Sequence, residues 1–246
     1  MPTVFRKKVA GIVVPAVGAA ALMCSSLASA PPAAAIAGGY DLDWSANASG
    51  MVSLQAWKAD TTGQCSGAAL GDPSRRRSSR VLTAWHCIRD YDLANVRVFS
   101  GGNRNGDGNN GVYTVDSYQR LNYAQGGEAD AVILNLKTEI TNMQPFPWTR
   151  TLPPDGSRVH MDGYGMINTQ GDSKLKQAEV IKTNDEKLSG PNGERACSGD
   201  SGGPVLDSNG FVFGVLSKGS DKPNCYVGSP YPPEYVALGR TDISPM

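Results

Sequence analysis

The feature that most constrains this chain is its series of short apolar segments, each closed by a turn rich in glycine or proline. With 29 glycines and 16 prolines in 246 residues, turns recur too often for long helices. No stretch past residue 40 keeps a helical period. The expected strands are Met51–Trp57, Val96–Phe99, Val112–Val115, Ala131–Leu136, Gly203–Leu206 and Phe211–Leu216. We therefore predict an all-β chain with a sandwich or barrel architecture.

The first residues have the layout of a secretory signal peptide. A basic stretch ending at Lys8 precedes an apolar run over Val9–Leu22, and small residues follow up to Ala30. The alternative, an uncleaved membrane anchor, is disfavoured because the run is short for a span of about 20 residues. We expect cleavage after Ala30, or after Ala35, which also has small residues at the required spacing. The protein should then be secreted, with no membrane attachment after the signal is removed.

The charges of the chain are balanced, with 23 basic and 23 acidic residues. This balance gives no electrostatic reason to expect nucleic acid or an anionic membrane as a partner. Hydrophobic residues make up 40% of the chain, enough for an ordinary globular core.

Export from the cell changes the expected chemical state of the five cysteines. Cys24 leaves with the signal peptide, and four cysteines remain in an oxidising compartment, where disulfides are favoured over free thiols. Four cysteines allow three pairings. A zinc site is the alternative, but the chain has no C-x-x-C pair and only two histidines. The four are Cys65, Cys87, Cys197 and Cys225.

The strongest chemical signal is the segment Gly199-Asp200-Ser201-Gly202-Gly203-Pro204. A serine hydroxyl becomes a useful nucleophile when a base removes its proton and when N–H donors face the developing oxyanion. Glycines on both sides let the backbone turn so that the N–H groups of Gly199 and Ser201 converge. This segment therefore predicts a nucleophilic serine with an oxyanion hole beside it.

Two further segments supply a base and a carboxylate. A β-rich segment, Val81 to Cys87, ends in His86 and Cys87, whereas His160 lies in a plain alternating strand and is expected to be structural. Asp130 enters an apolar run, where burial is costly unless the carboxylate is paired. A hydrogen bond to the His86 ring would satisfy it and fix the ring tautomer. Glu128 is the rival, and Asp130 is preferred because it directly precedes the apolar run.

With these segments in the order His, Asp, Ser, the chain resembles the trypsin/chymotrypsin-like serine proteases, as a secreted member of bacterial type. The resemblance extends over nearly everything after residue 35. It is carried also by Ile36-Ala-Gly-Gly39, Cys65-Ser-Gly-Ala-Ala-Leu70, Gly163-Tyr-Gly165 and Val215-Leu-Ser-Lys-Gly219.

The resemblance implies two six-stranded antiparallel β-barrels with the active site in the cleft between them. The expected divisions are a signal peptide (1–30), a candidate short pro-peptide (31–35), an N-terminal barrel (36–140) and a C-terminal barrel (141–246). It also implies disulfides Cys65–Cys87 and Cys197–Cys225, and Ser217 supporting Asp130. No cofactor or metal is expected, and the chain is expected to be a monomer.

Two further expectations concern maturation and specificity. In the family, a freed N-terminal amine pairs with the aspartate before the nucleophile, which here implies a pair of Ile36 and Asp200. Arg195 stands where trypsins carry the aspartate at the floor of the specificity pocket, so cleavage after Lys or Arg is not expected. Either Arg195 faces inward and attracts acidic side chains, or it points to solvent or pairs with Glu194 and leaves a pocket for small or apolar side chains. The other expected pocket residues are Ser217, Lys218 and Gly219.

The predicted function is that of a secreted serine endopeptidase that hydrolyses peptide bonds through an acyl-enzyme, with a polypeptide as substrate. The alternatives are a catalytically silent homologue that binds a partner through the same cleft, and an esterase on the same triad. Weaker features favour exposed turns: the polar run over 102–110, which holds a single acidic residue, and Arg75-Arg76-Arg77.

Overall fold

A computed structural model describes residues 36–43, 50–101, 111–165, 174–219 and 225–244. The predicted signal peptide, the short pro-peptide and the 102–110 loop lie outside these residues. Within the described part of the chain, no helix is long and apolar enough to cross a membrane.

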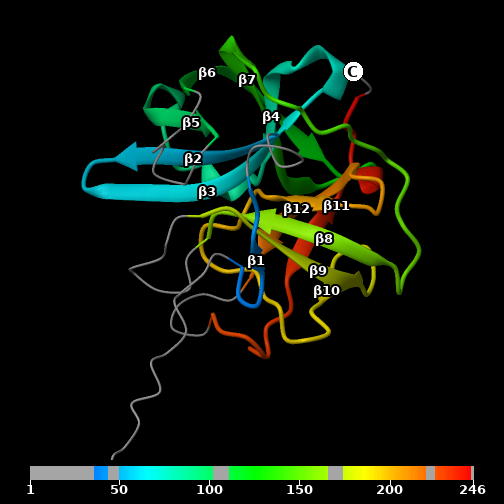
Figure 1. Ribbon diagram of the computed structural model, residues 1–246. Coiled ribbons are helices and arrows are strands. Elements are labelled where there is room, and N and C mark those ends of the chain that lie inside the picture. Colours follow the sequence, from blue (N-terminus) through cyan, green and yellow to red (C-terminus); the bar gives the residue numbers. More distant parts are fainter. Residues whose placement is uncertain (1–35, 44–49, 102–110, 166–173, 220–224, 245–246) are drawn as a thin grey trace, which may run out of the picture. The chain divides into compact units, whose positions relative to one another are not determined.

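The first half of the described chain is a closed six-stranded antiparallel barrel (Figure 1). The strands follow one another around it in the order β2-β3-β4-β7-β6-β5. Most neighbouring strands of the barrel are consecutive in sequence, and two pairings between non-consecutive strands complete the ring: β4 with β7 and β2 with β5. The strands are β2 (Met51–Lys58), β3 (Thr61–Leu70), β4 (Arg77–Thr83), β5 (Val96–Ser100), β6 (Gly111–Asn122) and β7 (Glu128–Thr141).

The second half, together with β1 from the start of the described chain, forms a seven-stranded sheet of order β1-β9-β8-β11-β12-β13, with β10 paired to β9. Its strands are β1 (Tyr40–Asp41), β8 (Arg158–Gly163), β9 (Lys176–Lys182), β10 (Leu188–Ser189), β11 (Pro204–Leu206), β12 (Val212–Lys218) and β13 (Glu234–Ala237). The helices of the described residues are four short 3-10 turns: η1 (Pro73–Arg75), η2 (Trp85–Cys87), η3 (Leu93–Asn95) and η4 (Leu238–Arg240). The predicted all-β, two-barrel fold class is confirmed.

Two local predictions needed correction. The strand expected to run to His86 ends at Thr83, and the histidine lies in the 3-10 turn that follows. Strand β9 was not predicted, because its Lys and Glu residues hide the alternation. Lys182 on this strand is almost fully buried, yet its ammonium pairs with the carboxylates of Asp155 and Asp185.

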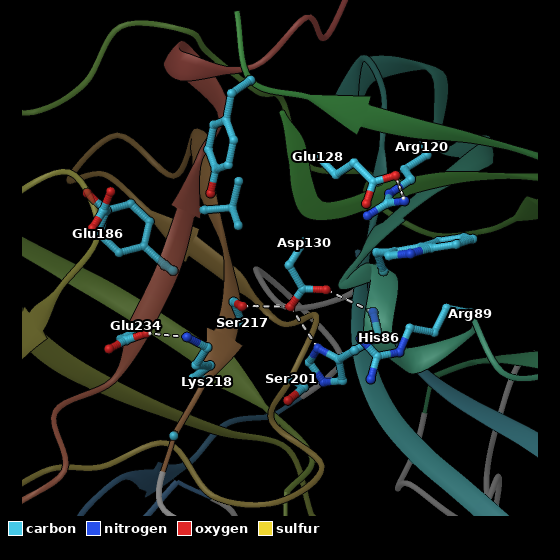
Figure 2. Close-up of a pocket in the computed structure, with 15 residues that line it drawn as sticks. His86, Arg89, Arg120, Glu128, Asp130, Glu186, Ser201, Ser217, Lys218 and Glu234 are labelled. Atoms are coloured by element: carbon cyan, nitrogen blue, oxygen red, sulfur yellow. Dashed lines mark hydrogen bonds and ion pairs between the residues drawn. The ribbon is translucent and has the colours of Figure 1, made fainter. Parts of the chain in front are cut away.

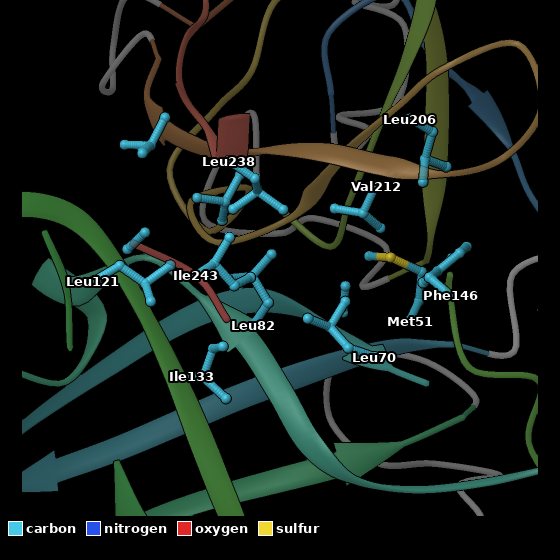
Figure 3. Packing of buried hydrophobic residues seen from close by; sticks show 14 of the residues in the cluster. Met51, Leu70, Leu82, Leu121, Ile133, Phe146, Leu206, Val212, Leu238 and Ile243 are labelled. Atoms are coloured by element: carbon cyan, nitrogen blue, oxygen red, sulfur yellow. The ribbon is translucent and has the colours of Figure 1, made fainter. Parts of the chain in front are cut away.

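An apolar core joins the two halves (Figure 3). Its buried members come from strands of the barrel and from strands and turns of the sheet. Because interiors pack at crystal-like density, this shared core fixes the two halves against each other. The labelled members are Met51, Leu70, Leu82, Leu121, Ile133, Phe146, Leu206, Val212, Leu238 and Ile243.

A buried carboxyl group lies in β8. Asp162 is fully enclosed and accepts a hydrogen bond of 2.8 Å from the Gln177 side chain. Burial raises the pKa of the Asp162 carboxyl to about 7, and the Gln177 hydrogen bond lowers it only in part. Between roughly pH 4 and 7 the folded chain therefore holds a proton that the unfolded chain has lost.

The first prediction follows from that difference. The free energy of unfolding should fall as pH rises through this window, with the full loss present above pH ~7. Asp162→Asn should be more stable than the parent at pH ~8, by up to a few kcal/mol, and the gain should shrink towards pH ~4. Urea unfolding at both pH values measures it. Exposed Asp60→Asn is the control, and an equal effect at both pH values would contradict the prediction.

Candidate active site

His86 is placed by the turn after β4. The chain leaves the barrel at Thr83 and folds into η2, and the Cys65–Cys87 disulfide ties that turn back to β3. Closing a loop of 22 residues stabilises the folded chain by about 3 kcal/mol in a chain-entropy model. The second disulfide joins Cys197 to Cys225, so both bonds match the pairing that the family resemblance implies.

Asp130, near the start of β7, contacts this histidine through both carboxylate oxygens. The His86 backbone N–H donates to Oδ1 at 2.8 Å, and ring Nδ1 lies 2.7 Å from Oδ2. The Ser217 hydroxyl donates to Oδ2 at 2.6 Å. Burial alone would raise the pKa of the Asp130 carboxyl, but the hydrogen bonds from His86 and Ser217 hold it below its usual value. The charged carboxylate can then keep the ring in the tautomer that leaves Nε2 free to accept a proton.

Glu128, the rival carboxylate, also lines the cleft but pairs with Arg120. Its Oε1 pairs with Arg120 at 2.5 Å, and the Arg120 guanidinium stacks over the Trp85 ring at 4.8 Å. Trp85 also packs on Tyr118, with ring centroids 5.3 Å apart. Trp85, Arg120 and Glu128 form a wall of the cleft next to His86. Sequence reasoning gave no hint of Arg120, because its stacking partner Trp85 lies 35 residues earlier in the chain.

Ser201 follows a loop whose backbone conformation requires glycine. Gly199 has a φ of +96°, and a Cβ there would lie 3.1 Å from the Cα of Gly165. Figure 2 shows the Ser201 hydroxyl beside the His86 ring, with Asp130 and Ser217 behind it. The structure thus brings the predicted histidine, aspartate and serine to one place from both halves of the fold.

Ser66 on β3 is a site residue that sequence reasoning missed. Its backbone N–H donates to the Ser201 carbonyl at 2.8 Å, and its hydroxyl donates to the Gly199 carbonyl at 2.8 Å. The same hydroxyl accepts from the Tyr164 N–H at 2.9 Å. One fully buried serine thereby holds the nucleophile loop against the barrel. The one sequence feature that points to Ser66 is its position directly after Cys65.

Asp200 is fully buried beside the nucleophile and is surrounded by N–H donors. Oδ1 accepts from Gly165 at 2.7 Å, and Oδ2 accepts from Cys197 at 2.8 Å and from the backbone nitrogen of Ile36 at 3.2 Å. Ile36 is itself fully buried, and the neighbouring Ala37 pairs with Arg195 as a β-bridge. The structure therefore brings Ile36 and Asp200 together.

A cleft of about 780 Å³ opens in front of these groups, lined by residues from both halves (Figure 2). On the side of the sheet, Lys218 at the end of β12 pairs with Glu234 of β13 at 3.1 Å. Most of the cleft's charged side chains are thus paired across it or along its walls. The lining residues are Trp85, His86, Arg89, Arg120, Tyr123, Glu128, Asp130, Glu186, Ser201, Ser217, Lys218, Gly219, Glu234, Tyr235 and Val236.

Arg195 does not line this cleft. Its guanidinium donates to two backbone carbonyls, from Nε to Ser229 and from Nη1 to Glu194, both at 2.6 Å. The Glu194 carboxylate instead accepts from Asn192, at 2.9 Å from the backbone N–H and 3.0 Å from the side chain. Arg195 therefore neither faces into the cleft nor pairs with the Glu194 carboxylate, as the two expectations had it. It binds backbone carbonyls instead.

Among the described residues, one group of side chains has ligand atoms close enough together to bind a metal ion: Cys65, His86 and Cys87. Both sulfurs belong to the disulfide, so neither is a thiolate that could bind a cation. His160, expected to be structural, lies in β8, and its Nδ1 has no hydrogen-bond partner within the described part of the chain.

A barrel packed on a second β-sheet, with a cleft between them that holds histidine, aspartate and serine, defines the class of chymotrypsin-like serine proteases. The family model described as Trypsin matches residues 46–232, which is most of the chain. The chain belongs to the trypsin family of serine proteases.

Relatives of known sequence agree with this membership. The chain is 30% identical to the cercarial protease of Schistosoma mansoni, over 58% of this chain and 68% of that protein. It is 27% identical to hypodermin-B of Hypoderma lineatum, over 56% of this chain and 63% of that protein. The matches therefore span about two thirds of each relative's length.

Two solved structures share the fold. A scabies mite inactivated protease paralogue superposes with a TM-score of 0.64 at 22% identity, over 82% of this chain and 94% of the other. Mouse neuropsin, a serine protease, superposes with a TM-score of 0.62 at 20% identity, with the same coverage. At these identities the likeness establishes the fold alone.

The second prediction concerns the Ser217 hydroxyl. Ser217→Ala removes a hydrogen bond to Asp130, so the pKa of that carboxyl should rise and the histidine should be held less firmly. We expect the reaction of Ser201 with a fluorophosphonate to slow by about tenfold at neutral pH. Activity should also be lost at a higher pH on acidification. Labelling rates from pH ~4 to 8 measure both effects, with exposed Ser208→Ala as the control, and an unchanged profile would contradict the role.

Proposed function

We propose that this protein is a secreted serine endopeptidase in which Ser201 is the nucleophile, His86 the general base and Asp130 the carboxylate that orients it. The observation that carries the proposal is the hydrogen-bonded chain from Ser217 through Asp130 to His86, which ends beside Ser201 in an open cleft. Membership of a family whose relatives are proteases supports a polypeptide as substrate.

In the proposed reaction, His86 Nε2 takes the proton from Ser201 Oγ as that oxygen attacks the scissile carbonyl carbon. The developing oxyanion is bound by the backbone N–H groups of Gly199 and Ser201. The imidazolium then gives its proton to the leaving amine, the C–N bond breaks, and an acyl-enzyme remains on Ser201. Water attacks this ester with His86 again as base, which releases the acid and restores the serine.

The third prediction tests the nucleophile. Ser201→Ala should leave the fold intact, because one oxygen is removed from a half-buried site, and should lower turnover by about a million-fold. Peptide hydrolysis and fluorophosphonate labelling of the secreted protein measure it. Retention of more than a few per cent of activity would rule the assignment out.

The same assay separates the alternatives. A chain that is labelled and cleaves esters but no peptide in a broad library is an esterase. A chain that takes no label, with Ser201 exposed and the fold intact, is a silent homologue that acts as a binding module. Cleavage of internal peptide bonds supports the proposed endopeptidase.

Maturation is proposed to create the amine that completes the site. We infer that residues 1–30 are a signal peptide, that 31–35 are a short pro-peptide or the end of the signal, and that 36–140 and 141–246 form the two barrels. In the structure the Ile36 nitrogen is an amide that donates to Asp200. After cleavage before Ile36 the same nitrogen is an ammonium at neutral pH, and charge-assisted hydrogen bonds are roughly twice as strong as neutral ones.

The fourth prediction is therefore that the active secreted form begins at Ile36, followed by Ala37, Gly38 and Gly39. A buried carboxylate beside the oxyanion hole is costly without a cationic partner, so a form that begins at Pro31 should be far less active. N-terminal sequencing of fluorophosphonate-labelled protein checks this. Full activity in a form that keeps residues 31–35 would refute the mechanism, and a matched chain begun at Ile36 is the positive control.

A further inference from the structure

The two walls of the expected specificity pocket touch each other. One wall is the segment after Arg195, and the other is the end of β12 with Gly219. An ideal Cβ on Gly219 would overlap the Ala196 carbonyl group, 2.7 Å from its carbon and 3.0 Å from the Ala196 Cβ. Because the Gly219 Cα is one bond from that Cβ position, Gly219 itself lies in van der Waals contact with the Ala196 carbonyl group, and no substrate side chain fits between the two at this point. Consistent with this, Gly219 lines the open cleft, whereas Ala196 does not.

Arg195 holds this wall in place. Its guanidinium joins the segment before the nucleophile to the segment after Cys225, through the carbonyls of Glu194 and Ser229. The Cys197–Cys225 disulfide ties the same two segments together, and the bridge from Ala37 fixes the backbone of Arg195 itself. The rigid fork of an arginine can bind two carbonyls at once, which the single ammonium of a lysine does less well.

We propose that Arg195 acts as a tether that keeps the specificity pocket closed, so that this protease cleaves after glycine or alanine. The inference rests on the proposed function and names the substrate class of that site. Acidic side chains gain little, because the Arg195 donors that face the pocket walls already bind carbonyls and would lose those bonds. Basic side chains meet a fixed positive charge of the same sign.

The outer cleft then recognises the substrate residues that precede the cleaved bond. Lys218 and Glu234 flank one side of it, and Trp85 with Arg120 flanks the other. A glycine or alanine before the cleaved bond needs no pocket, and the residues preceding it can lie along these walls. Arg195 thus determines substrate specificity and takes no part in bond cleavage.

The fifth prediction tests the closed pocket directly. Peptide amides that differ only in the residue before the cleaved bond should give a kcat/KM for alanine at least about 100-fold above that for phenylalanine, leucine, aspartate or lysine, because larger side chains must break the two tethering bonds. A preference for phenylalanine or leucine would overturn the inference. A preference for aspartate would also overturn it, because the Arg195 charge would then reach the substrate.

Variants of Arg195 test the tether. Arg195→Met keeps the length of the side chain without the donors. The ratio of kcat/KM for alanine to kcat/KM for leucine should therefore fall by about tenfold or more. Arg195→Lys keeps the charge without the fork, and should behave like the methionine variant. A ratio that stays at the parent value in both variants would overturn the tether. Arg97→Met is the matched control, since Arg97 on β5 also binds two backbone carbonyls, those of Ala94 and Val96.

Failure of this inference is distinguishable from failure of the proposed function. Each protein is first titrated with a fluorophosphonate that reports reactive Ser201. If the parent takes no label, the proposed function fails and the inference falls with it. If the parent is labelled and prefers a large or charged residue before the cleaved bond, the inference alone fails.

Discussion

The buried carboxylate of Asp200 is the interaction on which the rest of the site depends. It lies in the loop that carries Ser201, and its oxygens bind the backbone N–H groups of Ile36, Gly165 and Cys197. A buried carboxylate without such partners would be strongly destabilising. The loop therefore adopts the one conformation in which these donors converge, and that conformation sets Gly199 in the positive-φ geometry needed beside the nucleophile.

The proposed catalytic residues come from different halves of the chain, so their geometry depends on how firmly the halves are joined. His86 and Asp130 belong to the barrel, whereas Ser201 and Ser217 belong to the sheet. The shared apolar core supplies most of the burial, but apolar contacts alone do not fix a position to a fraction of an ångström. The buried hydrogen bonds of Ser66 supply that directional restraint between β3 and the nucleophile loop.

The sequence was enough for the fold class and for most barrel strands, because alternation leaves a local mark. It also singled out His86, Asp130 and Ser201, which the structure brings to one cleft. It failed where the deciding contact is remote in sequence. Three of the seven residues of strand β9 are charged, and its buried Lys182 is accommodated by the carboxylates of Asp155 and Asp185, which lie outside the strand. The role of Ser66 and the orientation of Arg195 likewise depend on partners more than 30 residues away. Whether Arg195 faced a pocket, solvent or Glu194 could not be decided without those partners.

The contrast between the pocket and the outer cleft suggests how specificity is divided in this protein. Arg195 binds carbonyls at 2.6 Å within a segment also held by a disulfide, so moving it requires breaking several bonds at once. The Lys218–Glu234 pair is different, because Lys218 is largely exposed and Glu234 is partly exposed, and surface ion pairs contribute only about 0–1 kcal/mol. A charged substrate residue can exchange with either member at little cost in free energy. In the proposed protease, the closed pocket would therefore select for size next to the cleaved bond, while the cleft walls would adapt to the residues that precede it.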